Sequence, residues 1–151
     1  EEKKINIWKG NTSREFLDSR GLTHLPEGDM GEGYSAQWRR WESCERDAVT
    51  VVAQPLYRKK VTDQVVELLD GIKKDPYSRR HIVTAWNPGM LDQMALPPCH
   101  LMHMYGVEGE FSSKDGKLNN CFIMRSTDVP YGLPYNIMSY SLLNHIFAKH
   151  L

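Results

Sequence analysis

The stretch DPYSRRHIVTAW, residues 75–86, marks the point where the chain changes from a helical to an extended pattern. Before it, residues 62–74 place apolar side chains at helical spacing and end in two lysines, which predicts a helix with Thr62 as its cap. Pro76 ends that helix, because the residue before a proline disfavours helical backbone. The run 81–86 is rich in β-branched residues and predicts a strand.

More strands and a last helix follow. Residues 101–107 and 117–125 predict two strands, joined by a loop whose Asp115-Gly116 pair favours a turn. Residues 137–150 predict a helix that is apolar enough to be central and buried. Its apolar stripe consists of Ile137, Tyr140, Leu143, Ile146 and Phe147.

Length and composition bound the fold class. The chain has 151 residues, of which 40% are hydrophobic and 25% charged, and this predicts one globular domain over residues 1–151. Residues 10–41 are rich in glycine and predict loops with short helical turns, the clearest helix start being at 12–17. The order of loops, helix, strand, strand pair and helix predicts a mixed α+β fold.

Charge and cysteine content narrow the function classes. The 19 basic residues balance 19 acidic residues, which argues against nucleic acid as the partner. No apolar run approaches the ~20 residues of a membrane span, and no signal core follows the first residues, so we expect a cytoplasmic protein. The cysteines Cys44, Cys99 and Cys121 lack metal-ligand spacing, and no metal site is expected.

Cys99 is the candidate nucleophile. Two prolines precede it and restrict the backbone that presents the thiol. A nucleophilic cysteine needs positive charge or hydrogen-bond donors nearby, and an arginine brought in by the fold would supply them. The alternative reading of Cys99 is a buried structural cysteine.

Two arginine motifs suit a phosphate group. Arg79 and Arg80 are adjacent at the entry to a predicted strand, where they could bind a phosphate or be an exposed charged pair. Arg125 is followed by Ser126, and together they could contact the same phosphate from a second direction. Asn136 could read the edge of a pyrimidine base or cap the last helix, and the sequence leaves both readings open.

Three histidines fall within apolar elements. His81, His103 and His145 are therefore predicted to be core or surface histidines with satisfied hydrogen bonds rather than ligands.

Taken together, these motifs resemble the thymidylate synthase family. The resemblance runs nearly end to end, in family order, and rests on residues 7–17, 28–39, 75–88, 94–100, 125–128 and 132–137. It implies a mixed α+β sandwich with a large curved sheet at a homodimer interface. It also implies reductive methylation of dUMP at C5, with 5,10-methylenetetrahydrofolate as cosubstrate.

The resemblance assigns roles to individual residues. Cys99 would add to C6 of the pyrimidine, and Arg125 would keep its sulfur ionised and bind the phosphate with Ser126. Arg79 and Arg80 would reach into the neighbouring subunit's site. The remaining assignments are base recognition by Asn136, base and pterin contacts by Asp128, proton handling by Tyr34 and His100, and folate contacts by Trp8, Asn11, Leu96, Asp128, Tyr131 and Gly132.

The chain departs from the family pattern in coverage and in three residues. It resembles only the middle of a synthase, without the segment that carries a catalytic glutamate and without the one that carries a ribose-binding His-x-Tyr. Lys9, Met124 and Tyr131 also differ from the residues usual in the family. These differences keep open a pyrimidine nucleotide 5-hydroxymethylase related to the phage enzymes, which adds water to the same intermediate. An inactive module that binds nucleotide or RNA is the third alternative.

Overall fold

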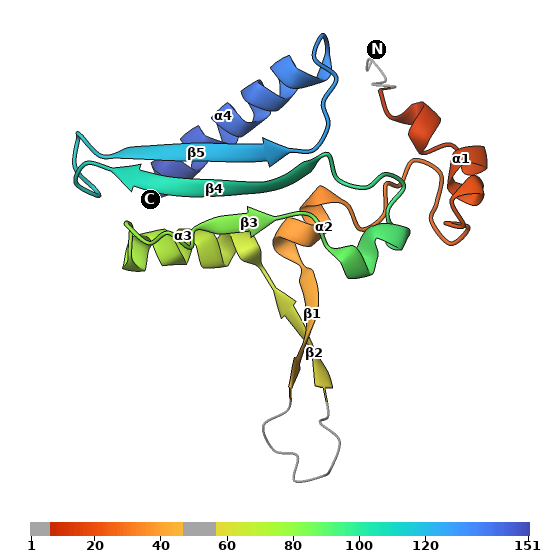
Figure 1. Cartoon of the computed structure of the whole chain (residues 1–151), viewed down its shortest axis with the longest axis horizontal. Helices are drawn as coiled ribbons and strands as arrows, with labels where there is room; N and C mark the ends of the chain where they lie inside the picture. The colour runs from red at the N-terminus through yellow and green to blue at the C-terminus, as the bar shows by residue number, and fades with distance from the viewer. Residues whose placement is uncertain (1–6, 47–56) are drawn as a thin grey trace.

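The computed structural model describes residues 7–46 and 57–151, which form an α+β arrangement of two antiparallel sheets and several helices (Figure 1). The first part contains a short 3-10 helix η1 (Lys9–Asn11), then α1 (Arg14–Ser19) and α2 (Tyr34–Arg39), which confirms the predicted short helical turns. The Ser13 hydroxyl caps α1 by accepting a hydrogen bond from the amide of Phe16.

The central sheet has the order β3–β4–β5 and is antiparallel throughout. Its strands are β3 (Ile82–Thr84), β4 (His100–Glu108) and β5 (Lys117–Met124), which confirms the three predicted strands. Strand β3 is shorter than the strand predicted over residues 81–86, although the amide of Ala85 still donates a hydrogen bond to the carbonyl of Leu101. The turn between β4 and β5 is tight, since a Cβ on Gly116 would lie 2.6 Å from the carbonyl oxygen of Glu110.

The predicted helix before β3 forms as α3 (Gln64–Lys74), but its cap is Asp63 and the prediction of Thr62 was wrong. The Asp63 carboxylate accepts hydrogen bonds of 3.1 Å from the amides of Val65 and Val66. Thr62 is instead the last residue of a strand, where it pairs with Trp41. A side chain held in a sheet register is not free to fold back over the start of the helix.

The sequence analysis missed a hairpin. It consists of β1 (Trp41–Arg46) and β2 (Tyr57–Thr62), which run out from α2 and return to α3, away from the central sheet (Figure 1). Cross-strand ion pairs link Glu42 to Lys59 at 2.7 Å and Glu45 to Arg58 at 2.6 Å. Half of the residues in its strands are charged and none is buried, so the strands lack the apolar alternation that predicts a strand.

The last helix, α4 (Gly132–His150), begins five residues before the predicted start at 137. Asn136 therefore lies inside the helix, and the alternative that it is the N-cap was wrong, because Tyr131 occupies that position. The helix is also not fully buried, contrary to the prediction. Tyr140 and Phe147 are buried against the sheet, whereas Ile137 and Ile146 are 51% and 54% exposed on the side that no described element covers.

One hydrophobic core joins α3, α4 and one face of the central sheet. Its buried residues are Leu68, Ile72, Val83, Tyr105 and Phe147. The opposite face of the sheet is apolar but open, with Ile82 and Ile123 43% and 40% exposed. A second cluster of Leu17, Leu22 and Ala95 attaches α1 to the segment that precedes β4. Within the described ranges, no helix is long and apolar enough to cross a membrane.

The loop before α2 approaches the segment before β4 through a glycine. Gly31 has a φ of 73° and forms an isolated bridge with Met94. A Cβ at position 31 would overlap the carbonyl oxygen of Gln93. Gly21 has nearly the same φ, 74°, but open space around it.

We predict that Gly31→Ala destabilises the protein by more than Gly21→Ala. Both substitutions place alanine at a left-handed backbone, which costs about 1–2 kcal/mol. Only the first adds a steric clash and pushes the two loops apart. Urea unfolding of both variants measures the difference. Equal decreases in the free energy of unfolding would show that the close contact between Gly31 and Met94 does not contribute to stability.

Candidate active site

Cys99 lies at the junction between a buried turn and the start of β4. Met94, Ala95 and Pro98 are buried, while Cys99 is half-buried and keeps its thiol accessible. The carbonyl of Cys99 accepts a hydrogen bond of 2.9 Å from the amide of Arg125 at the end of β5. The backbone of the candidate nucleophile is thus attached to the sheet on one side and to the core on the other. Because Cys99 is only half-buried, it differs from the alternative of a fully buried structural cysteine.

Arg125 is the arginine that the fold brings to Cys99. Its Nε donates to the carbonyl of Pro98 at 2.9 Å and its Nη2 to the carbonyl of Pro97 at 3.1 Å. The same Nη2 lies 3.9 Å from Cys99 Sγ, and the guanidinium carbon lies 5.7 Å from the centre of the Trp86 ring. This arrangement holds a positive charge where it stabilises negative charge on the sulfur.

Tyr34 and His100 form a polar cluster beside the thiol. The Tyr34 hydroxyl, at the start of α2, accepts hydrogen bonds from the amides of Cys99 (2.8 Å) and His100 (3.4 Å). The Nδ1 of His100 lies 3.1 Å from the hydroxyl of Tyr140. Burial raises the pKa of Tyr34 and lowers that of His100, a shift that a hydrogen bond from Asn136 partly opposes. At neutral pH the tyrosine is therefore protonated and the imidazole neutral.

The residues that follow β5 form an exposed turn leading into α4. Ser126 and Asp128 are exposed, and the Asp128 carboxylate accepts a hydrogen bond of 3.3 Å from the amide of Tyr131. The amide of Asn136 contacts the sulfur of Met124 at 3.5 Å, so both side chains lie next to the end of β5. Together with Arg125, these groups present donors and acceptors around one end of the sheet.

The candidate folate residues come from three places: the N-terminal part, the segment before β4 and the turn after β5. Trp8 and Tyr131 are 56% and 75% exposed, so both rings are available to stack on a flat ligand. Leu96 and Gly132 are half-buried, as is Asn11. Within residues 7–46 and 57–151, no hydrogen bond connects the Trp8 and Asn11 group to the Tyr131 and Gly132 group.

Arg79 and Arg80 are not part of this cluster. They precede β3, at the end of the sheet opposite to Cys99 (Figure 1). Because Ile82 pairs with Met104, Arg80 lies beside the far part of β4, about 20 Å along the strand from Cys99. Both arginines are exposed.

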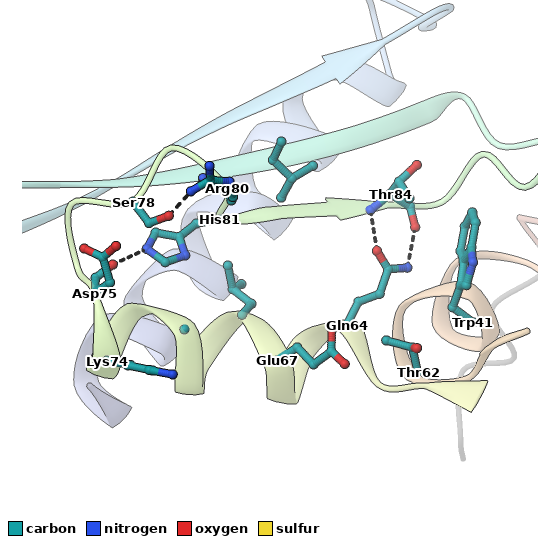
Figure 2. Close-up of a pocket in the computed structure, with 13 residues that line it drawn as sticks. Trp41, Thr62, Gln64, Glu67, Lys74, Asp75, Ser78, Arg80, His81 and Thr84 are labelled. Atoms are coloured by element: carbon teal, nitrogen blue, oxygen red, sulfur yellow. Dashed lines mark hydrogen bonds between the residues drawn. The ribbon is translucent and has the colours of Figure 1, made fainter. Parts of the chain in front are cut away.

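A cavity in the described part of the chain lies away from the nucleophile. It has a volume of 540 Å³ and lies between α3 and the outer edge of β3. At one end of it the Gln64 amide accepts from the amide of Thr84 and donates to its carbonyl, at 2.9 and 2.8 Å, in place of a neighbouring strand (Figure 2). Arg80 and His81 line the other end, where His81 contacts the carbonyl of Asp75. A smaller apolar cavity of 250 Å³ borders the cluster near Cys99, and its lining includes Tyr34, Trp38, His100 and Tyr140.

Two residues of the site were missed from the sequence. Trp86 received no role in the site, although the Arg125 guanidinium lies over its ring. Tyr140 was placed only on the apolar stripe of the last helix, yet its hydroxyl holds His100. Its position four residues after Asn136 was the available signal, because residues four apart share a helix face. In the part of the chain that the structure describes, no group of three acidic, histidine or cysteine side chains could hold a metal ion.

Comparison with known proteins places the chain among its relatives. The family model for thymidylate synthase matches residues 1–151. A bifunctional dihydrofolate reductase-thymidylate synthase of Zea mays is 44% identical over 149 residues, which cover 99% of this chain and 26% of that protein. A probable thymidylate synthase of Schizosaccharomyces pombe is 44% identical over 153 residues, covering 97% of this chain and 23% of the relative.

A third relative is the thymidylate synthase of Agaricus bisporus, 40% identical over 151 residues that cover 97% of this chain and 48% of that protein. The chain thus spans between 23% and 48% of the length of these relatives.

We predict that the stability of the fold decreases as the pH falls below about 6.5. Burial lowers the pKa of His103 to about 4, whereas an unfolded histidine titrates near its usual value. Between these values the unfolded chain binds more protons, so the free energy of unfolding declines by up to ~1.4 kcal/mol per pH unit for this group.

Urea unfolding between pH 7 and pH 4.5 measures this slope. His103→Leu should reduce it, whereas His145→Leu, at an exposed position on α4, should not. Equal slopes in the two variants would contradict the assignment to His103.

Proposed function

The chain belongs to the thymidylate synthase family, and from this premise we propose that the protein catalyses the reductive methylation of dUMP at C5. The observation that carries the proposal is the placement of Cys99, with a guanidinium 3.9 Å from its sulfur and a tyrosine hydroxyl on its amide. A thiolate in this position adds to C6 of the pyrimidine, forming a sulfur–carbon bond and making C5 nucleophilic. The methylating reading is the one that the names of the relatives favour.

The cosubstrate would be 5,10-methylenetetrahydrofolate, which supplies the one-carbon unit and the hydride when it is bound. The exposed rings of Trp8 and Tyr131 and the exposed carboxylate of Asp128 suit a flat pterin with amide-like edges. Leu96, Gly132 and Asn11 would complete its contacts. The protein's own residues bind and orient the two substrates and move the C5 proton, and Cys99 leaves C6 once the methyl group is formed.

The phosphate of dUMP would lie beside Arg125 and Ser126. The hydrogen bonds that Arg125 makes within the described residues use Nε and Nη2, which leaves Nη1 available to bind the phosphate. Asn136, adjacent to Met124, would read the uracil edge with its amide. Tyr34 and His100 are protonated and neutral respectively, so the neutral imidazole of His100 could accept the C5 proton, or pass it through water, and release it to solvent.

We infer that the active form is a homodimer in which Arg79 and Arg80 complete the neighbour's phosphate site. The open apolar face of the central sheet, which includes Ile82 and Ile123, suits a second copy of the same surface. The distance of about 20 Å between Arg80 and Cys99 supports this arrangement, because one subunit cannot bring both to one ligand. A cytoplasmic location and the absence of a nucleic acid partner remain predictions.

We predict that the full-length protein converts dUMP and methylenetetrahydrofolate into dTMP and dihydrofolate. Cys99→Ser should lower kcat by at least 10³-fold, because the hydroxyl is a far weaker nucleophile than a thiolate. Fluorodeoxyuridylate with the folate should give a covalent adduct at Cys99, detectable by mass spectrometry. Cys44→Ser, at an exposed position on β1 away from the central sheet, is the matched control and should retain the adduct.

The product distinguishes this proposal from the alternatives. A 5-hydroxymethyl nucleotide with tetrahydrofolate released would identify a hydroxymethylase and give Met124 and Tyr131 a role in admitting water. Binding of dUMP without adduct or product would identify an inactive nucleotide-binding module.

Subunit complementation tests the shared site. Arg79→Ala/Arg80→Ala and Cys99→Ser should each be inactive alone. Mixed dimers formed by co-expression should regain up to about a quarter of the wild-type activity, because half of the dimers are mixed and each holds one intact site of two. A mixture as inactive as its components, in dimers shown to be mixed, would place the arginines in their own subunit's site or outside any site.

A further inference from the structure

A buried histidine that the proposed reaction does not use lies behind His100. His103, on β4, is 1% exposed, and its Nδ1 lies 3.0 Å from the hydroxyl of Tyr105. Its Nε2 is also buried and has no hydrogen-bond partner among the described residues. His103 is thus a core histidine, as predicted, but only one of its two ring nitrogens has a hydrogen-bond partner among the described residues. An unpaired buried polar atom lowers the free energy of unfolding, whereas an apolar side chain of similar size would not. A role for the His103 ring would explain why a histidine occupies this position.

The ring of His103 packs directly on Tyr140. The two ring centres are 5.3 Å apart in an edge-to-face arrangement, at an interplanar angle of 62°. Tyr140 also stacks on Phe122 with ring centres 4.4 Å apart and planes within 11° of parallel. With 4% of its surface exposed, the tyrosine has little freedom to turn. These two rings therefore determine where its hydroxyl points.

The Tyr140 hydroxyl contacts the imidazole of His100. It lies 3.1 Å from Nδ1, and His100 adjoins Cys99 in the chain. The position of the His100 ring therefore depends on Tyr140, which is held in turn by His103. This gives a continuous set of contacts from the core of the sheet to the neighbour of the nucleophile.

The surroundings of His103 contain no carboxylate that would favour its charged form. The side chains that face it, from α2, β3, β4, β5 and α4, are Trp38, Val83, His100, Tyr105, Phe122 and Tyr140. The titratable groups among them are two tyrosines and one histidine. His103 therefore stays neutral at physiological pH and packs as a ring that still holds the Tyr105 hydroxyl.

We propose that His103 is a positioning residue for His100: it fixes the Tyr140 ring, whose hydroxyl orients the His100 imidazole beside Cys99. The catalytic consequence rests on the proposed function. The positioning itself does not, since it is a property of the folded chain and is measured on the His100 imidazole.

The test is His103→Leu in the full-length protein, with the ring nitrogens of His100 followed by NMR. Loosening Tyr140 should let water reach His100, so its titration should move toward that of an exposed histidine and its ring-nitrogen resonances should shift. The expected kinetic effect is a tenfold or greater loss in kcat with the KM for dUMP within twofold of wild type. Tyr140→Phe should reproduce both changes, and adding His103→Leu to it should cause little further change.

Controls separate positioning from general destabilisation. His145→Leu, on the exposed side of α4, should leave the His100 titration unchanged. If His103→Leu does not fold, His103→Met, which also removes the ring but adapts its shape to the surrounding side chains, serves in its place. A folded variant with unchanged His100 titration and resonances would overturn the proposal, as would additive effects in the double variant. A shifted His100 titration in a protein without synthase activity would retain the positioning role and reject the proposed function.

Discussion

The hydrogen bonds from Arg125 to the carbonyls of Pro97 and Pro98 are the interaction on which the site depends. Prolines have no amide hydrogen, so Pro97 and Pro98 cannot donate backbone hydrogen bonds to a neighbouring strand. A guanidinium supplies donors from outside, in charge-assisted hydrogen bonds that are stronger than neutral ones. The same group places its charge next to Cys99. One side chain thus fixes the backbone and prepares the chemistry.

The segment before β4 is also held from the opposite side by the N-terminal part of the chain. The amide of Glu32 donates to the carbonyl of Gln93 at 3.1 Å, and the amide of Ala95 donates to that of Met30 at 3.0 Å. The close approach requires glycine at position 31. The loop also leads into α2, which carries Tyr34 to the amide of Cys99. The glycine-rich region is therefore a scaffold for the thiol, although the sequence alone indicates only loops.

The strands of the central sheet, α3, and the proximity of an arginine to Cys99 could be predicted, because they rest on local patterns and on a family motif. Contacts that depend on distant partners could not. The cap moved from Thr62 to Asp63 because Thr62 belongs to a strand whose charged sequence gives no strand signal. The apolar stripe on α4 indicated a buried helix. Apolar spacing, however, shows only which residues share a face of the helix, and it does not show whether another element covers that face.

The separation of the two arginine motifs follows from the antiparallel sheet and not from flexible loops. Arg80 precedes β3 and Cys99 precedes β4, so pairing of these strands in opposite directions places the residues at opposite ends. The separation of about 20 Å exceeds what rotation of an arginine side chain can span. In the proposed homodimer the exposed arginine pair would serve the site of the other copy, and the open apolar face of the same sheet would be the surface through which the two copies meet. The register that builds the fold thereby places the arginine pair and the candidate nucleophile of one chain about 20 Å apart, at opposite ends of the sheet.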